Sequence, residues 1–587
     1  MKKNRFLFLL KPFFKYGKGY FLIMLILPVI CNAVSILVSV SMDKQIIDSI
    51  IAGNGFVYTI KTALFWEALF VGVFIADSFI TLNLQNVNYY KITSKITEDI
   101  YDKALHTDVA NTDLPGFYDS YSYTVREYPG LSHAALTTLS QICVSVVGVA
   151  TVFSAVSYLS WFAVLLTALY ALTTIPLDRK TSELSAERRE QMNSASRRLG
   201  YIQKLFYQKE YLFPFRITDF RRHVLRDFHE TYEKITSIQK EKNLKLCLIT
   251  VFQTVYARAI TLVIMGIYIH LIISGKLSIG SFVAVMSATK ILRSIFHNFA
   301  GHYRKIRELC LSTNKMYDFF NVTPTIEKPG GKSLVSAASG DFELKLSQVS
   351  FHYPNSDRGV KSIDLCIKSG QKTAIVGKNG SGKSTLVKLL LRLYAPDSGS
   401  ITLNNIPIEE YDISNYRNSV GVALQDSHIF AFSVRDNLTR YCDVADSEML
   451  NALEKLDLKN VCEISRGDLN RQLTREFYAD GIELSGGEKQ KIAIASVLVG
   501  IFDLLIFDEP TSQLDPISEY NLNSLILSES NKNATVIISH RLSLVKNADL
   551  ILVMNDGEIV ERGTHADLMQ KGGLYREMYE KQAREYT

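Results

Sequence analysis

Cysteine is scarce in this 587-residue chain, and its pattern argues against two kinds of site. The seven cysteines are scattered and odd in number, and they form no C-x-x-C pair. Disulfide frameworks and structural zinc sites need paired or regularly spaced cysteines, so we expect neither and predict reduced thiols. The net charge of +6 is also small for this length. Because no basic module interleaved with aromatic residues occurs, we expect no nucleic-acid partner.

Length and composition predict at least two domains, since 587 residues exceed what one hydrophobic core supports. Up to about Asn321, long apolar runs alternate with basic loops. From Asp341 onward, short strand-like and helical segments alternate with glycine-rich turns. We predict an all-α transmembrane domain of six helices with long intracellular helices, followed by an α/β domain. The predicted boundaries are 1–18 for an interfacial helix, 19–320 for the transmembrane domain, 321–340 for a linker and 341–587 for the α/β domain.

Six apolar stretches are long enough to cross a bilayer, which takes about 20 helical residues. They are 19–41, 58–84, 134–156, 159–177, 247–273 and 279–300. Residues 1–18 are basic and amphipathic, which favours a helix at the membrane surface, with a disordered tail as the alternative. Sixteen Lys or Arg lie between Arg179 and Lys245, whereas the connection between the third and fourth stretches has none. The positive-inside rule therefore places the long loops and both termini in the cytoplasm.

The two cytoplasmic connections, about 85–133 and 178–246, are too long for simple links and keep a helical pattern. Each has a break with clustered aromatic residues, at 111–120 and at 207–217. Exposed aromatics at a chain reversal favour docking onto another domain. An ordinary aromatic-lined turn is the alternative.

Six ionisable residues lie inside the predicted spans, where charge is costly and often functional. They are Glu67, Asp77, Arg258, Lys290, Arg293 and His297. The last three follow one another at spacings of three and four, which places them on one face of a helix. We predict that these residues line a substrate cavity with positive charge left over. Structural salt bridges between the cations and the two carboxylates are an equally weighted alternative.

The segment GKNGSGKST (377–385) follows the apolar strand TAIV and precedes a helical run. Glycines let backbone N–H groups surround a β-phosphate, Lys383 reaches the β- and γ-phosphates, and the Ser384 hydroxyl can hold Mg²⁺ at a helix N-terminus. The predicted phosphate-binding residues are Gly377, Asn379, Gly380, Ser381, Gly382, Lys383, Ser384 and Thr385. This arrangement is specific for a nucleotide-binding loop.

The segment LLIFDEP (504–510) is an apolar strand that ends in two carboxylates. Alone, such a pair is more often a turn or a helix cap. It follows the phosphate-binding loop at a wide interval, and SQLD (512–515) and VIISHR (536–541) come after it. We therefore predict that Asp508 orients the Mg²⁺ shell and that Glu509 polarises the attacking water as the general base.

Together these segments resemble the ATP-binding cassette (ABC) transporter superfamily. FHYP, GKNGSGKST, Gln425 in VALQD, LSGGE (484–488), LLIFDEP, SQLD and SHR occur in the family's order over roughly 240 residues. The LSGGE signature separates this family from other ATPases with a phosphate-binding loop. Fusion of the membrane helices to one cassette resembles exporter-type half-transporters, particularly those of Gram-positive bacteria.

The resemblance implies ATP and Mg²⁺ as cofactors and assigns further residues. Tyr353 looks like the aromatic that stacks on adenine, and Gln425 matches a loop residue that contributes to Mg²⁺. His540 matches the histidine that contacts the γ-phosphate. Ser485, Gly486 and Gly487 should bind the ATP held by another subunit, and Asp515 belongs to the loop that follows the catalytic carboxylate. A second copy is therefore implied, with a different half-transporter as the alternative partner.

Four departures from the family pattern stand near the signature and the following loop: Glu488, Lys491, Ser496 and Gln513. Segment 474–483 also lacks the usual exporter sequence, and Glu476 is a candidate for its missing contact.

The predicted function is ATP-driven export of a peptide or amphipathic compound across a bacterial cytoplasmic membrane. An ATP-gated channel or sensor subunit, and a chelate importer built on the exporter fold, are the alternatives. An intact Glu509 argues against a pure switch.

Overall fold

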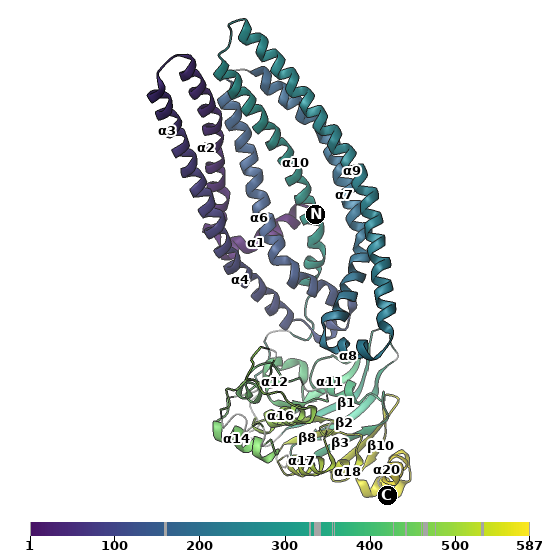
Figure 1. Cartoon of the computed structure of the whole chain (residues 1–587). Coiled ribbons are helices and arrows are strands. Elements are labelled where there is room, and N and C mark those ends of the chain that lie inside the picture. The colour runs from purple at the N-terminus through teal and green to yellow at the C-terminus, as the bar shows by residue number, and fades with distance from the viewer. Residues whose placement is uncertain are drawn as a thin grey trace. The chain divides into compact units, whose positions relative to one another are not determined.

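The computed structural model describes residues 2–157, 161–327, 330–333, 342–354, 356, 358–425, 428–440, 443–458, 461, 468–475, 477–512, 514–529 and 533–585. The chain divides into two compact units (Figure 1). One comprises Met1–Ala104 and Asp119–Asn321, and the other comprises Leu105–Tyr118 and Val322–Thr587. The second unit thus includes a short piece of the first predicted cytoplasmic connection.

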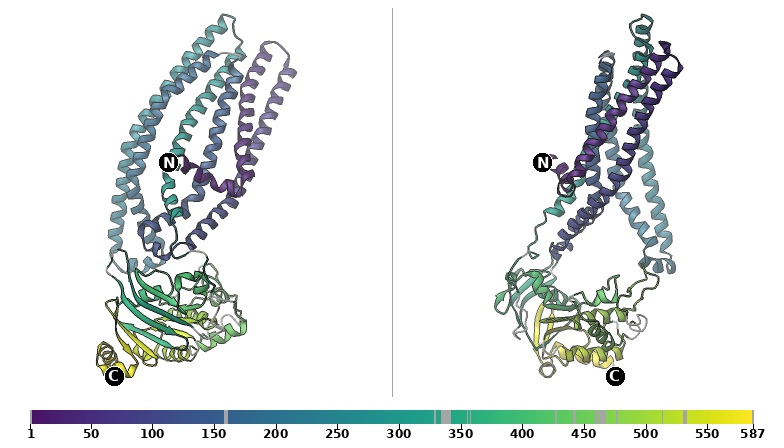
Figure 2. Two further views of the ribbon diagram at one scale, coloured as in Figure 1. Left: turned by 180° about the vertical axis from the view of Figure 1, so that it is seen from behind. Right: turned by 90° about the vertical axis from the view of Figure 1, so that its left-hand side faces the viewer.

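The first unit is helical throughout its described residues. Its elements are α1 (Lys2–Tyr16), α2 (Lys18–Ile51), α3 (Phe56–Phe79), the π-helix η1 (Ile80–Gln85), α4 (Asn86–Leu105), α6 (Pro115–Ser157), α7 (Trp161–Tyr207), α8 (Lys209–Ile217), α9 (Phe220–Ile273) and α10 (Ile279–Asn321). α3, η1 and α4 follow one another without interruption. Figure 2 shows α7 and α9 side by side along most of their lengths.

Five of these helical stretches are long and apolar enough to cross a membrane. They are Lys18–Ile51, Phe56–Leu105, Gly116–Ala155, Phe220–Ile273 and Ile279–Asn321. The predicted span 159–177 falls in α7, where residues 158–160 and the side chains of 161–172 lie outside the described residues. The helices continue far beyond the apolar stretches, as the predicted fold class requires.

The N-terminal helix α1 buries its apolar side within the protein. Leu9, Leu10 and Phe13 are almost fully buried, and Phe8 stacks on Tyr128 of α6. The apolar stripe of this amphipathic helix therefore contacts neighbouring helices rather than lipid alone.

A short helix overlaps each predicted break, although α6 already begins at Pro115, inside the first one. α5 (Val109–Thr112) lies between α4 and α6, and α8 lies between α7 and α9. Three other prolines, Pro28, Pro129 and Pro176, lie inside long helices that continue through them. Neighbouring packing therefore outweighs the lost hydrogen bond at those positions.

The second unit contains two sheets. One has the strand order β2-β1-β4-β5, formed by β1 (Glu343–His352), β2 (Gly359–Lys368), β4 (Ser398–Leu403) and β5 (Ile406–Pro407). The other has the order β10-β9-β3-β8-β7-β6, formed by β3 (Lys372–Gly377), β6 (Val420–Ala423), β7 (Leu504–Asp508), β8 (Ala534–Ile538), β9 (Leu550–Asn555) and β10 (Glu558–Gly563). All of its strands pair in parallel except β10, which runs antiparallel to β9.

Helices complete this α/β unit. They are α11 (Lys383–Leu390), α12 (Ile413–Asn418), α13 (Val434–Leu438), α14 (Asp446–Lys455), α16 (Gly486–Leu498), α17 (Pro516–Glu529), α18 (Leu542–Val545), α19 (His565–Lys571) and α20 (Leu574–Glu585), with the 3-10 turn η2 (Ile408–Glu410). The central strands are largely apolar, and all five residues of both β7 and β8, including Asp508 at the end of β7, are buried. Because β3, β7 and β8 run in parallel, their polar carboxyl ends meet at one sheet edge.

Candidate nucleotide-binding site

The glycine-rich loop joins the end of β3 to the start of α11. Gly382 has φ +102° and precedes the first helical residue, a backbone conformation that side chains rarely adopt. A Cβ at Gly377 would lie 2.3 Å from the Met554 carbonyl oxygen, so only glycine fits there. The loop's tight path therefore follows from its glycines, and it ends at the N-terminus of α11, where free backbone N–H groups favour an anion.

Two buried polar groups in this loop suit a phosphate. The Lys383 ammonium is nearly buried and donates to the carbonyl oxygens of Gly377 at 2.9 Å and Lys378 at 3.0 Å. Burial lowers the pKa of Lys383, while the negative charges of Glu509 and Asp508 oppose that shift. The Ser381 Oγ is buried without a hydrogen-bond partner among the described residues. An anion at this position would satisfy both groups.

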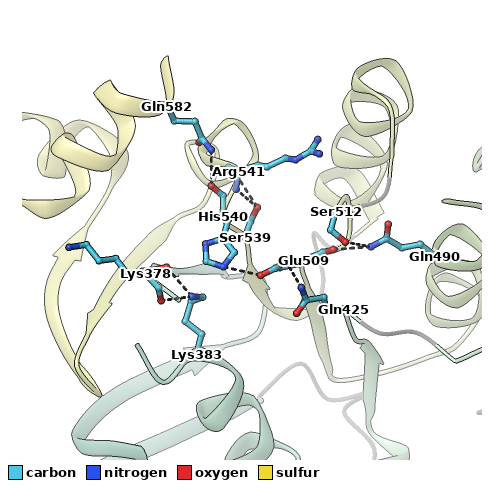
Figure 3. Close-up of polar contacts among 11 residues, drawn as sticks. Lys378, Lys383, Gln425, Gln490, Glu509, Ser512, Ser539, His540, Arg541 and Gln582 are labelled. Atoms are coloured by element: carbon cyan, nitrogen blue, oxygen red, sulfur yellow. Dashed lines mark hydrogen bonds and ion pairs between the residues drawn. The ribbon is translucent and has the colours of Figure 1, made fainter. Parts of the chain in front are cut away.

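Glu509 joins side chains from three segments at the sheet edge (Figure 3). Its Oε2 accepts from Gln425 Nε2 at 2.9 Å, and its Oε1 lies 3.0 Å from His540 Nε2. Its backbone N–H donates to the Ile538 carbonyl oxygen at 2.9 Å. The end of β7, the end of β8 and the segment after β6 thus converge on one carboxylate.

Glu509 also adopts a backbone conformation that is uncommon for a residue with a side chain. Its φ is +49°, in the left-handed region. Such conformations are held only where surrounding contacts determine them, and they cluster at functional sites. This geometry turns the carboxylate away from the strand direction.

Burial lowers the pKa of His540, and the nearby positive charge of Lys383 lowers it further, while Glu509 opposes both. The imidazole is therefore neutral near pH 7. In the neutral form with a proton on Nε2, it donates to the Glu509 carboxylate. The Gln582 side chain donates to the His540 backbone carbonyl oxygen at 3.0 Å and ties the C-terminal helix to this loop.

The signature segment forms the start of α16. The Ser485 Oγ accepts from the Glu488 N–H at 3.3 Å, and the Glu488 carboxylate accepts from the Ser485 N–H at 2.8 Å. This reciprocal cap explains why Glu is acceptable where the family more often has Gln, since a carboxylate also suits the positive end of the helix dipole. Gly486 and Gly487 occupy the first helical turn.

Two further predicted residues have local partners. Tyr353 is half-buried and packs against Phe351 and Tyr394, with ring centroids 5.2 and 5.6 Å away, and the Lys388 ammonium lies 5.3 Å from its ring. Asp515 accepts from the N–H groups of Ile517 and Ser518 at 3.1 and 3.0 Å and so caps α17. The pKa of Asp515 is lowered, first by a hydrogen bond from the Ser518 side chain and then by these backbone hydrogen bonds.

Residues 360–512 match the family model described as ABC transporter. The C-terminal domain belongs to the ABC transporter family. Similar proteins include the mitochondrial iron-sulfur clusters transporter ATM1 of Candida glabrata, 32% identical over 314 residues, which are 52% of this chain and 42% of that protein. The alpha-hemolysin translocation ATP-binding protein HlyB of Escherichia coli O157:H7 is 39% identical over 319 residues, which are 54% of this chain and 44% of that protein.

An ATP-dependent lipid A-core flippase of Alcanivorax borkumensis is 29% identical over 354 residues, and the match covers 60% of each chain. The matches therefore span about half the length of these relatives, from 42% to 60%. A solved bacterial Atm1-family ABC exporter with ATP bound has a TM-score of 0.78 and 22% identity, over 96% of this chain and 98% of that one. This likeness shows that the whole chain has the fold of an ABC exporter.

The donors at the cassette's sheet edge fit Mg²⁺ held together with phosphates. The described residues contain no cluster of three His, Cys, Asp or Glu that could hold a metal alone. Mg²⁺ at nucleotide sites is held by one or two protein oxygens plus the substrate's phosphates. The Asp508 carboxylate at the end of β7, the Ser384 hydroxyl in the first turn of α11 and the Gln425 amide oxygen are donors of that kind.

Sequence reasoning missed Gln490 in the cassette. This buried side chain of α16 donates to the Glu509 backbone carbonyl oxygen at 2.9 Å and to the Ser512 Oγ at 3.3 Å. The only signal in the sequence was a polar residue at a position of α16 whose neighbours are mostly apolar. Two residues noted in the sequence, Glu476 and Gln513, lie outside the described residues.

The six ionisable residues of the predicted spans lie on three helices. Glu67 and Asp77 are on α3, Arg258 is on α9, and Lys290, Arg293 and His297 are on α10. All are exposed except Arg293, which is half-buried. No ion pair joins any two of these described residues, so the salt-bridge alternative finds no support within one chain.

Proposed function

We propose that this chain is a half-transporter that hydrolyses ATP and uses the energy to export a substrate across a membrane by alternating access. The convergence of Lys383, Gln425, Glu509 and His540 at one sheet edge carries this proposal, because these groups can bind a triphosphate and activate water. The chain's membrane-length helices supply the path.

In this mechanism the loop N–H groups and Lys383 bind the β- and γ-phosphates. The Glu509 carboxylate accepts a proton from the attacking water, and neutral His540 donates from Nε2 to a γ-phosphate oxygen. Both side chains exchange their mutual contact of 3.0 Å for contacts with ATP and water. Ser384, Gln425 and Asp508 would hold Mg²⁺, which would neutralise part of the phosphate charge.

The working unit in this proposal is a dimer of two copies. Ser485, Gly486 and Gly487 at the N-terminus of α16 present N–H groups suited to the γ-phosphate of ATP held by the other copy. We further propose a bacterial cytoplasmic membrane as the location, with both termini inside, and a peptide or amphipathic compound as cargo. The similar proteins come from both bacteria and mitochondria.

The test is ATPase activity of the chain reconstituted in liposomes. We expect Glu509→Gln to lower the turnover rate by at least about a hundredfold while ATP binding survives, because only the proton acceptor is lost. Glu448→Gln, at an exposed position of α14, is the matched control and should turn over like wild type. Turnover by Glu509→Gln within a few-fold of wild type would refute the assignment.

A further inference from the structure

Three basic side chains lie on one face of α10 within a predicted membrane span. Lys290, Arg293 and His297 are spaced three and four residues apart, so they lie along the same side of the helix. At about 1.5 Å per residue, Lys290 lies roughly 16 Å from the start of α10, near the middle of a hydrocarbon core about 30 Å thick. Lys290 therefore lies where an uncompensated charge is most costly.

The opposite face of α10 makes its packing contacts. Ala284, Val285, Ala288 and Leu292 are buried in a cluster with residues of α2, α6 and α9: Ile36, Val40, Val152, Ile264 and Tyr268. A helix turns 100° per residue, so Lys290 and His297 lie about 120° or more around α10 from each of these four residues, and the half-buried Arg293 lies about 80° from the nearest, Val285. They are not drawn into the core of their own chain.

Among the described residues, no ion pair joins an acidic side chain to Lys290, Arg293 or His297. Glu67 and Asp77 are on α3, which packs chiefly against α2, whereas α10 packs against α2, α7, α1 and α9. On α2, the Asp43 Oδ2 accepts from the Ser287 hydroxyl at 3.0 Å, one helical turn before Lys290. Asp43 forms no ion pair with Lys290 among the described contacts. Arg258 of α9 adds a further exposed cation.

We propose that this face of α10 binds an oxyanion, a carboxylate or a phosphate, carried by the transported molecule. The inference rests on the proposed export function and names the chemistry of its cargo. Arg293 offers a planar pair of donors that matches both oxyanions, and Lys290, one turn away, adds a compact positive charge.

Binding to the chain in phosphatidylcholine nanodiscs tests this, with N-dodecanoyl-glutamate and its uncharged dimethyl ester as the two probes. We expect wild type to bind the acid at least about tenfold more tightly than the ester, since a charge-assisted contact is worth that much. The double variant Lys290→Gln/Arg293→Gln should lose this preference. Lys276→Gln, an exposed lysine in the loop before α10, should keep it.

Equal binding of acid and ester by wild type would overturn the proposal, and so would an unchanged preference in the double variant. The comparison of acid and ester binding by wild type needs no variant, so it tests the proposal even if the double variant misfolds. Binding is measured without ATP, so this experiment and the Glu509→Gln ATPase test can fail separately. Adding phosphatidylglycerol identifies where the bound oxyanion comes from. If this lipid competes with N-dodecanoyl-glutamate, the site binds a lipid headgroup. If it does not compete, the site binds a non-lipid cargo.

Discussion

At the scale of single residues, sequence motifs identified candidate site residues whose function requires one particular type of side chain. Gln425, Glu509 and His540 are distant in sequence, yet parallel strands bring them within hydrogen-bonding distance. Gln490 escaped such reasoning because its role depends on a neighbour 19 residues away that only the fold places beside it. A side chain that holds a backbone oxygen has no pattern of its own in the sequence.

We predict that Gln490→Leu slows ATP turnover by roughly tenfold without weakening ATP binding. The change keeps the side chain's size but removes the donor to the Glu509 carbonyl oxygen, which leaves that oxygen unsatisfied and frees the catalytic loop. Single-turnover hydrolysis and nucleotide binding in the reconstituted protein separate the two effects. Weaker ATP binding with an unchanged hydrolysis step would contradict a positioning role for Gln490.

At the scale of elements, apolar length predicted the long helices well, while details of their backbones were not predictable. The π-helix Ile80–Gln85 lies at the end of the predicted span 58–84 and carries no sequence signal. Pro115 begins α6 as a break predicts, but Pro129 lies inside the same helix. The effect of a proline depends on what packs around it.

One buried carboxylate organises the segment before the cassette's first strand. Asp108, beside α5, accepts hydrogen bonds from the N–H groups of Thr325, Ile326 and Glu327 and from the Thr325 hydroxyl, at 2.7–2.9 Å. Burial alone would raise the pKa of Asp108, but these hydrogen bonds together lower it below the ordinary carboxyl value. Residues more than 200 positions apart are thereby joined within one unit.

We predict that Asp108→Asn destabilises the C-terminal unit by about 2 kcal/mol at pH 7, because an amide has one acceptor oxygen and would turn its NH2 group toward backbone donors. A carboxylate with a depressed pKa stabilises the fold above its unfolded pKa of about 3.9 and loses that effect as the pH falls through the folded value. The difference from wild type should therefore shrink below about pH 4. Calorimetric unfolding against Asp119→Asn, an exposed position, measures it. A gap that stays constant into acid would contradict this account.

At the scale of the whole molecule, much of the apolar surface of the long helices is exposed in a single chain. Only 6% of the apolar window in Phe56–Leu105 and 17% of that in Phe220–Ile273 is buried, against 39% in Ile279–Asn321. Lipid or a second copy must cover such helices. Sequence alone could not rank the burial of the predicted spans, because every span is apolar whichever neighbour it meets.

The central claim is that ATP closes two copies of this chain around shared sites. The most direct test introduces one cysteine at Asn379, in the phosphate-binding loop, and another at Ser485, at the start of α16. The chain that carries them has its seven native cysteines replaced and also carries Glu509→Gln. Oxidation in nanodiscs with ATP should yield a covalent dimer, and without ATP far less. Cross-linking only within single chains, or a dimer yield that does not change with ATP, would contradict the account.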